Sequence, residues 1–386
     1  MLVEELYAFN PWWEEDFKPE LIEREKYLSI LESSLKTKDI VIITGLRRVG
    51  KTAIIKLFIK KLLAKIPPQY ILYASCDSIQ LENYSIHEII ETYRKEHRIK
   101  RNKKIYVFLD EIGFREKWAQ ELKNLYDREN IKFFISASSA SMLKDKKGFL
   151  TGRTKTIRIF PLNFHEYLKF KKIDIKKSEN YLKESYFEDY MKEGGIPEYV
   201  LRKDPAYLNE LVESIIYKDI IYYHGIKNSG IVKDFFRLLM ERVARRISLN
   251  KSAKILKVSA DTIRRYFNYF KESFLIYEVE RCGKLSERIL SPKKIYASDV
   301  GIRNMITGFS GKGAIFENLF FFKIMSKQPC YIYEDGIEID FLTKDKILFE
   351  VKYNEKMNEK QKTLFDKIRA KEKKLISNIN DYFFYE

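Results

Sequence analysis

The chain has 386 residues, 45% of them hydrophobic, which is enough for two or three domains that each bury a core. Its formal net charge of +17 favours a polyanion such as nucleic acid as a partner, although the lysine-rich surface of a heat-adapted protein would give the same excess. No apolar run approaches the length of a membrane span, and the first residues lack a signal pattern, so we expect neither a membrane-bound nor a secreted protein.

The three cysteines, Cys76, Cys282 and Cys330, lie far apart in the sequence. They form no C-x-x-C pair, so we expect neither a disulfide framework nor a zinc site. Together with the missing signal pattern, this predicts an intracellular, cytoplasmic protein.

An apolar run at residues 39–43 leads into a glycine-rich loop, and an amphipathic segment at 53–59 follows. The loop fits G-x-x-x-x-G-K-[ST], the phosphate-binding pattern of nucleotide triphosphatases, in the expected strand–loop–helix context. Lys51 would neutralise the β- and γ-phosphates of ATP, and the Thr52 hydroxyl would hold Mg²⁺. The alternative is a glycine turn that contains Lys-Thr by chance. The predicted ATP-binding residues are Gly45, Leu46, Arg47, Arg48, Val49, Gly50, Lys51 and Thr52.

A second apolar run, at residues 103–109, ends in the carboxylates Asp110 and Glu111. Such a run is the expected companion of a phosphate loop. Asp110 would orient Mg²⁺ through its water shell, and Glu111 would polarise the attacking water. Because two adjacent carboxylates are costly without a cation, the pair predicts metal-dependent hydrolysis of ATP.

A third apolar run, at residues 131–135, leads into a serine-rich segment. Ser136 and Ser138 are equal candidates for a side chain that reads the γ-phosphate or positions water; the alternative is a turn that caps the next helix. Arg153 follows further on. It could face its own nucleotide or that of a neighbouring subunit, or it could belong to a solvated basic loop.

Residues 164–228 have a helical pattern that is interrupted at Gly194-Gly195. The two glycines predict a sharp turn between helices, and a hinge is the less favoured interpretation. Residues 248–256 and 259–271 then read as a helix-turn-helix with serine caps, and the apolar segment 274–279 fits the start of a wing.

The second of these helices carries the predicted DNA-binding side chains on its outer face. They are Thr262, Arg264, Arg265 and Asn268. Residues 242–271 contain nine basic residues and one acid, Asp261, which suits contacts with phosphates. A protein-docking module is the alternative.

Two alternating segments near the end, 336–342 and 347–353, predict a hairpin. If Thr343 pairs with Ile347, Asp340 lies opposite Glu350, and Glu338 lies opposite Lys352.

The hairpin has the D…E-x-K arrangement of restriction-endonuclease-like folds. There the carboxylates of Asp340 and Glu350 would bind Mg²⁺ and Lys352 would help to activate water, with Glu317 as a further ligand from an upstream helix. The alternative is a solvated sheet face with a Glu338–Lys352 ion pair. Cleavage of DNA stays open, since such a domain can also serve only to hold DNA.

Six segments carry a family resemblance, and they occur in the order Asn10 to Trp13, Gly45 to Thr52, Asp110-Glu111, Gly152-Arg153, Pro161 to Tyr167 and Gly194 to Glu198. Together they resemble the archaeal and bacterial AAA+-like ATPases over nearly the whole chain. The resemblance implies an α/β fold: an αβα P-loop core, a helical lid, a winged helix and a small α/β domain of the restriction-endonuclease-like PD-(D/E)xK type. It also implies a homo-oligomer, such as a hexameric ring, with Arg153 as a candidate trans-acting arginine.

We therefore expect an ATPase core at residues 1–163, a lid at 164–229, a winged helix at 230–298 and a nuclease-like domain at 299–386. The predicted function is Mg²⁺-dependent binding and hydrolysis of ATP by a protein that binds and remodels DNA, branched or broken DNA included. One alternative is a nucleotide-dependent signalling or defence switch that docks a protein partner. The other is an ATP-regulated, metal-dependent nuclease.

Overall fold

The computed structural model describes residues 2–140, 143 and 147–385. They form two compact units, Met1–Phe160 and Pro161–Glu386, each described separately below. The division lies close to the predicted end of the ATPase core at residue 163. The finer division of residues 164–386 into a lid, a winged helix and a nuclease-like domain stays a prediction.

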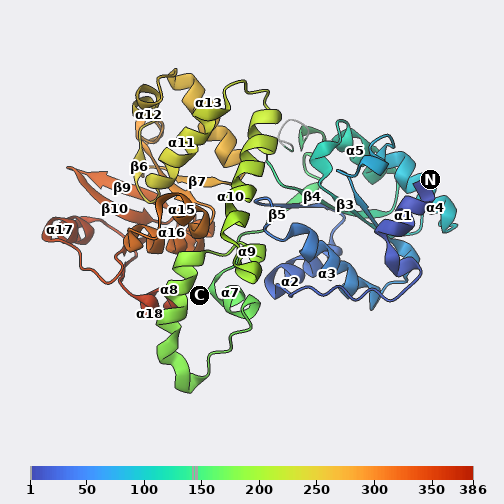
Figure 1. Ribbon diagram of the computed structural model, residues 1–386, viewed down its shortest axis with the longest axis horizontal. Helices are drawn as coiled ribbons and strands as arrows, with labels where there is room; N and C mark the ends of the chain where they lie inside the picture. The colour runs from blue at the N-terminus through green and yellow to red at the C-terminus, as the bar shows by residue number, and fades with distance from the viewer. Residues whose placement is uncertain (1, 141–142, 144–146, 386) are drawn as a thin grey trace. The chain divides into compact units, whose positions relative to one another are not determined.

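A five-stranded parallel sheet forms the centre of the first unit (Figure 1). Its strands are β1 (Ile40–Thr44), β2 (Ile71–Ser75), β3 (Ile105–Asp110), β4 (Ile131–Ala137) and β5 (Thr154–Arg158). Their spatial order is β2-β3-β4-β1-β5, so β4 lies between β1 and β3. Because the strands are parallel, the segments that follow β1, β3 and β4 all leave the sheet at the same edge.

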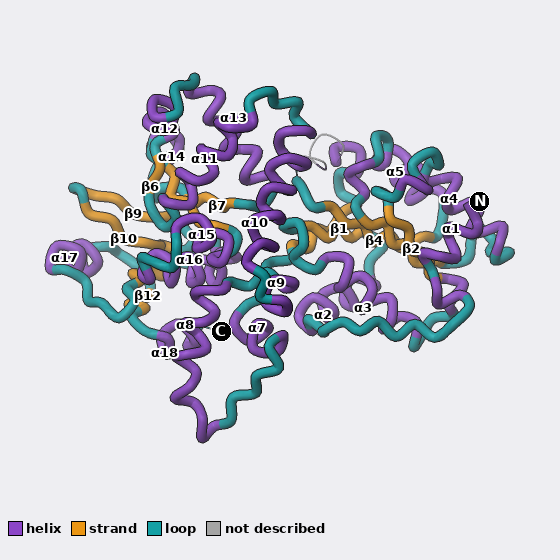
Figure 2. The backbone as a smooth tube through the Cα atoms, viewed as in Figure 1, coloured by secondary structure: helices purple, strands orange, loops and turns teal. Residues whose placement is uncertain are grey.

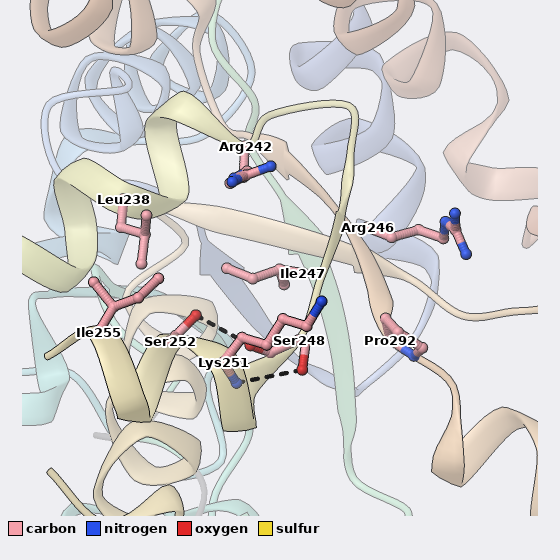
Figure 3. A pocket seen from close by; sticks show the side chains of 9 residues that line it. All are labelled: Leu238, Arg242, Arg246, Ile247, Ser248, Lys251, Ser252, Ile255 and Pro292. Carbon is pink, nitrogen blue, oxygen red and sulfur yellow. Dashed lines mark hydrogen bonds between the residues drawn. The ribbon is translucent and has the colours of Figure 1, made fainter. Parts of the chain in front are cut away.

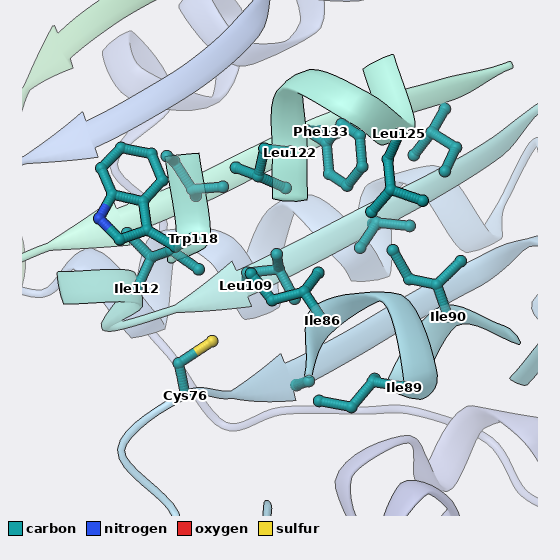
Figure 4. Close-up of a cluster of buried hydrophobic side chains, with 14 of the residues drawn as sticks. Cys76, Ile86, Ile89, Ile90, Leu109, Ile112, Trp118, Leu122, Leu125 and Phe133 are labelled. Atoms are coloured by element: carbon teal, nitrogen blue, oxygen red, sulfur yellow. The ribbon is translucent and has the colours of Figure 1, made fainter. Parts of the chain in front are cut away.

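Helices cover both faces of this sheet, as its fully buried central strands require. They are α1 (Leu2–Phe9), α2 (Glu25–Ser33), α3 (Lys51–Leu63), α4 (Ile86–Glu96) and α5 (Trp118–Arg128). On one face, α4 and α5 pack apolar side chains such as Ile90 and Trp118 against Leu109 and Phe133 of the strands (Figure 4). On the other face, Phe58 of α3 contacts Phe134, with the ring centroids 5.3 Å apart. The sheet is thereby fixed between two apolar layers.

The second unit begins with a series of helices. They are α7 (Phe164–Phe170), α8 (Lys183–Glu193), α9 (Pro197–Arg202), α10 (Pro205–Ser214), a π-helical segment at Ile215–Tyr222 and α11 (Ser229–Glu241). The predicted turn at Gly194-Gly195 joins α8 to α9 and is tightly packed. The Gly195 N–H donates to the buried Asp299 carboxylate at 2.6 Å, and a Cβ at Gly195 would lie 2.3 Å from the Leu162 carbonyl oxygen. Such contacts favour a fixed turn over a hinge.

Two helices and a small antiparallel sheet follow α11. Their bounds are β6 (Arg246–Ile247), α12 (Leu249–Ile255), α13 (Ala260–Glu272), β7 (Ile276–Val279), α14 (Leu285–Leu290) and β8 (Lys293–Ala297), with the sheet order β6-β8-β7. Both predicted serine caps are present: the Ser248 hydroxyl accepts from the Lys251 N–H, and the Ser259 hydroxyl accepts from the Thr262 N–H. The predicted pair of helices is therefore confirmed.

The chain ends in a four-stranded sheet with helices before and after its strands. The elements are α15 (Val300–Thr307), α16 (Lys312–Ile324), β9 (Cys330–Glu334), β10 (Ile337–Leu342), β11 (Ile347–Val351), α17 (Glu359–Lys367), β12 (Glu372–Ile376) and α18 (Ile379–Phe384). The strand order is β12-β11-β10-β9, and Figure 2 shows this sheet and α17 in one region of the second unit. Phe341 pairs with Phe349, and Leu342 with Leu348, which is the predicted register of the β10–β11 hairpin.

None of the described helices combines the length and the apolar character needed to cross a membrane.

The expectation of no disulfide is wrong. Cys282 and Cys330 are joined, with an S–S distance of 2.10 Å, although they are 48 residues apart in the sequence. The Cys282 N–H donates to the Tyr331 carbonyl at 2.7 Å, so the segment after β7 runs beside the start of β9. Spacing along the chain cannot reveal such a pair. A loop of this length stabilises the fold by about 4 kcal/mol through the restricted unfolded chain. The cysteines therefore no longer support the prediction of an intracellular, cytoplasmic protein.

Thiol titration tests the disulfide directly. In denaturant without reductant we expect one reactive thiol, that of Cys76, and after reduction we expect three. The control Cys282→Ser should show two thiols before reduction, because Cys330 loses its partner. Three thiols in the unreduced wild-type protein would contradict the disulfide.

Candidate functional site

The phosphate loop connects β1 to α3 at the carboxyl edge of the first sheet. Gly45 is buried with φ at 149°, and a Cβ there would lie 2.2 Å from the Ile159 carbonyl oxygen. Gly50, with φ at 97°, immediately precedes the first turn of α3. Both glycines of the motif are therefore required by the backbone, which leaves the loop N–H groups and the start of α3 able to cradle an anion.

Lys51 is the buried cation of this loop. Its Nζ donates to the carbonyl oxygens of Gly45 and Leu46, both at 3.2 Å, and lies 3.7 Å from the Glu111 carboxylate. A phosphate bound in the loop would compete for the same ammonium group. Lys51 is thus placed to exchange contacts with the loop and Glu111 for contacts with phosphate.

Asp110 ends β3 and is the centre of a group of hydroxyls. The hydroxyl of Thr52 donates to its Oδ2 at 2.6 Å, that of Tyr73 donates to the same oxygen at 3.0 Å, and Ser136 donates to Oδ1. The Thr52 hydroxyl and the Asp110 carboxylate thus lie together beside the phosphate loop. These oxygen donors suit Mg²⁺, which is usually held by one or two protein groups, waters and substrate phosphates. When bound, Mg²⁺ would neutralise charge on the phosphates.

Glu111 has a strained backbone and a firmly held side chain. Its φ of 51° lies in the left-handed region, which is uncommon for a residue other than glycine and is often found at functional sites. Its Oε2 accepts from both the N–H and the hydroxyl of Ser138, at 3.2 and 3.0 Å. The two serine candidates thus have different side-chain partners: the Ser136 hydroxyl donates to the Asp110 carboxylate and accepts from the Glu111 N–H, whereas Ser138 donates to the Glu111 carboxylate.

Two residues at this edge, Tyr73 and Arg24, were not predicted from the sequence. Tyr73 lies on β2, and burial together with the Asp110 carboxylate raises the pKa of its hydroxyl, which keeps it a donor. Arg24 is buried and donates to the carbonyl oxygens of Val49, in the loop, and Phe160. A tyrosine inside a strand and a lone arginine before a helix resemble ordinary core and surface residues, so no sequence signal marks them.

Arg153 does not lie at this edge. It immediately precedes β5 and pairs with Asp127 of α5 at 3.2 Å. Because Thr154 pairs with Ile40 at the start of β1, Arg153 lies at the amino end of the sheet. Arg153 therefore does not reach the nucleotide of its own subunit. Its other predicted contact, with the nucleotide of a neighbouring subunit, stays a prediction.

A second candidate region is the basic surface of α11, α12 and α13. Ile263, Phe267 and Phe270 are buried as predicted, Arg264, Arg265 and Asn268 are exposed, and Thr262 is half-buried. A pocket of about 330 Å³ lies beside it, and Figure 3 shows Arg242 and Lys251 on either side of Ile247 there. The pocket residues are Leu238, Arg242, Arg246, Ile247, Ser248, Lys251, Ser252, Ile255 and Pro292.

The predicted metal site on the hairpin differs from the structure. The buried ammonium of Lys294, on β8, lies 2.7 Å from both Glu317 and Asp340. It thus occupies the space between two carboxylates that were predicted to bind Mg²⁺. Glu350 instead contacts Lys352 at 3.0 Å and accepts from Gln361 at 3.1 Å. Across the described residues, no group of three or more His, Cys, Asp or Glu side chains is arranged to hold a metal.

The charges of this cluster are strongly perturbed by burial. Burial raises the pKa of Glu317 and of Glu350 to about 8 in each case. Burial alone would lower the pKa of Lys294, but Asp340 and Glu317 raise it well above its ordinary value. The predicted alternative, a Glu338–Lys352 ion pair, is replaced by contacts of Glu338 with Arg246 and Lys294.

The parallel sheet and the contents of its carboxyl edge define a P-loop ATPase domain. In agreement, the family profile described as an AAA domain matches residues 37–168, and a profile described as a domain of unknown function (DUF8612) matches residues 184–313. An AAA domain of this kind implies nucleotide binding.

The chain is 30% identical over 375 residues to a Methanocaldococcus jannaschii protein named uncharacterized protein MJ1544, covering 91% of this chain and 82% of that protein. It therefore belongs to the same family as MJ1544. A Haemophilus influenzae protein, also named as uncharacterized, is 28% identical over 348 residues, or 85% of this chain and 86% of that protein. The solved Walker-type ATPase paby2304 of Pyrococcus abyssi is 16% identical, and the match covers 76% of this chain and 99% of that chain, with a TM-score of 0.49.

Lys51→Ala tests the nucleotide site. Loss of the ammonium should weaken ATP binding by about 10- to 100-fold, the equivalent of a charge-assisted hydrogen bond, as measured by calorimetric titration. Lys56→Ala is the matched control, because Lys56 is an exposed lysine of the same helix. Equal losses in the two variants would contradict the assignment of Lys51.

Proposed function

We propose that the protein hydrolyses ATP with Mg²⁺ and uses the nucleotide cycle to control its hold on DNA. The observation that carries hydrolysis is the placement of Glu111 beside Lys51, at the edge where Thr52 and Asp110 meet the phosphate loop. A carboxylate so close to the phosphate site is in reach of a water that attacks the γ-phosphate.

In this proposal the chain's own residues divide the work. The loop N–H groups and Lys51 hold the phosphates, while Thr52 and Asp110 hold Mg²⁺. Glu111 orients the attacking water and accepts its proton, and Ser138 keeps the Glu111 carboxylate in position. Bound phosphate would draw Lys51 away from Glu111, so substrate binding itself would change the charge that Glu111 experiences.

DNA binding is proposed for the region from α11 to β8. The order of the elements in this region supports a winged helix. One helix and one strand are followed by two helices and then by two further strands, which a connection containing α14 joins. Arg264 and Arg265 are exposed on the second helix of the pair, where a recognition helix presents its side chains. Arg242 and Lys251 at the pocket of Figure 3 add positive charge nearby, which suits the phosphate backbone.

The remaining proposals concern the terminal domain and assembly. The sheet of β9 to β12, with α16 before it and α17 within it, supports a restriction-endonuclease-like fold. We propose that this domain holds DNA without cutting it, because Lys294 occupies the space between its carboxylates.

Arg153, at the edge of the sheet remote from its own phosphate loop, is the proposed trans-acting arginine of a ring-forming homo-oligomer.

A DNA-stimulated ATPase measurement tests the proposed function. Wild-type ATP turnover should rise with at least one of single-stranded, duplex or four-way-junction DNA. Glu111→Gln should lower kcat by about 100-fold or more, because the general base is lost, while ATP still binds. A signalling switch that docks only protein would ignore all three DNAs, and that result would overturn the proposed coupling.

Arg264→Ala tests the DNA surface. We expect duplex affinity to fall by about tenfold, and the salt dependence of binding to flatten if the lost contact is to a phosphate. Arg202→Ala on α9 is the control, because Arg202 lies outside this region, is also exposed and also pairs with an acidic residue of its own helix. Equal effects of the two substitutions, measured by fluorescence anisotropy at several salt concentrations, would show only a general loss of positive charge.

A further inference from the structure

The side-chain cluster around Lys294 lies wholly within the second unit and is not used by the proposed ATPase. Lys294 is completely buried on β8. Its Nζ lies 2.7 Å from Glu317 of α16, 2.7 Å from Asp340 of β10 and 2.8 Å from Glu338 of β10. An ammonium group has three N–H donors, so each of them can meet one carboxylate.

The carboxylates are also held from their other sides. The Tyr296 hydroxyl donates to Glu317 at 2.7 Å, and the Val351 N–H donates to Asp340 at 2.9 Å. Arg246 pairs with Glu338 at 2.7 Å while its guanidinium lies over the ring of Tyr333. The acidic oxygens thus converge on one point, and their positions are also fixed by β8 itself and by two further elements of the fold, β6 and β11.

The point where these oxygens converge is one that a cation must fill. Three carboxylates that approach within a few ångströms repel one another and need positive charge between them. Divalent cations such as Mg²⁺ or Mn²⁺ prefer oxygen donors of this kind. A buried lysine at the same point satisfies the charge and excludes a divalent cation, because its ammonium fills the space between the carboxylate oxygens and would repel a second cation placed there.

We propose that Glu317, Glu338 and Asp340 form a cation site whose resident cation is the ammonium of Lys294, and that removal of Lys294 converts it into a divalent metal site. The built-in cation replaces the metal that a nuclease-like fold would recruit. It also ties β8 to α16 and β10. This inference rests on the nuclease-like fold proposed above and is independent of ATP hydrolysis and of the winged helix.

Mn²⁺ binding to the full-length, nucleotide-free protein tests this inference, with bound ion counted by electron paramagnetic resonance. In the wild-type background, Asp340→Asn should leave Mn²⁺ binding unchanged, since Lys294 already fills the site. Lys294→Met should raise Mn²⁺ affinity at least tenfold, and Asp340→Asn in that background should abolish the gain. Lys293→Met is the matched control: Lys293 is the adjacent lysine of β8 but pairs with Glu280, so it should gain no Mn²⁺.

Nicking of supercoiled plasmid DNA is measured on the same samples. The wild-type protein should not nick DNA in Mg²⁺ or Mn²⁺. Wild-type Mn²⁺ binding or nicking that Asp340→Asn removes would overturn the proposal, because a metal would then displace the lysine. A folded Lys294→Met variant without a new Mn²⁺ site would overturn it as well. If that variant does not fold, Lys294→Gln, which is uncharged but keeps an amide donor for the carboxylates, is judged by the same criterion, while the wild-type comparison stands by itself.

Discussion

Parallel pairing of β1, β3 and β4 is the constraint on which the nucleotide site depends. Because β4 lies between β1 and β3, the loop after β1, the carboxylates that end β3 and the serines of β4 meet at one edge. No single segment could bring these groups together. The apolar layers on the two faces of the sheet keep the strands in register, so packing far from the site fixes distances of about 3 Å within it.

The sequence predicted the parts of the structure that are encoded locally. The phosphate loop, the carboxylates at the end of β3, the two serine caps and the hairpin register all follow from residues within a few positions of one another. Tyr73, Arg24 and the disulfide were missed because their partners are distant: Tyr73 lies 37 residues from Asp110, and the cysteines are 48 apart. Only the folded chain brings these residues together.

Lys294 shows why a correct motif can predict the wrong chemistry. The hairpin register places Asp340 and Glu350 near one another, as the D…E-x-K pattern requires. From the sequence we therefore expected a metal ion to balance the charge of these carboxylates. The structure supplies that charge from β8, which is 46 residues before Asp340. Carboxylate spacing therefore identifies the need for a cation, but not its identity. The same reasoning applies to Lys51 and Glu111, where the cation also comes from the chain.

The disulfide has a consequence for how the second unit responds to proteases. Cys282 and Cys330 close a covalent ring that contains α14, whose Leu285, Ile289 and Leu290 are among the most exposed apolar side chains of the described chain. Exposure makes this segment accessible to a protease. A cut within the ring would leave two fragments that remain joined and migrate together until the protein is reduced. Cleavage at this exposed segment therefore does not release either half.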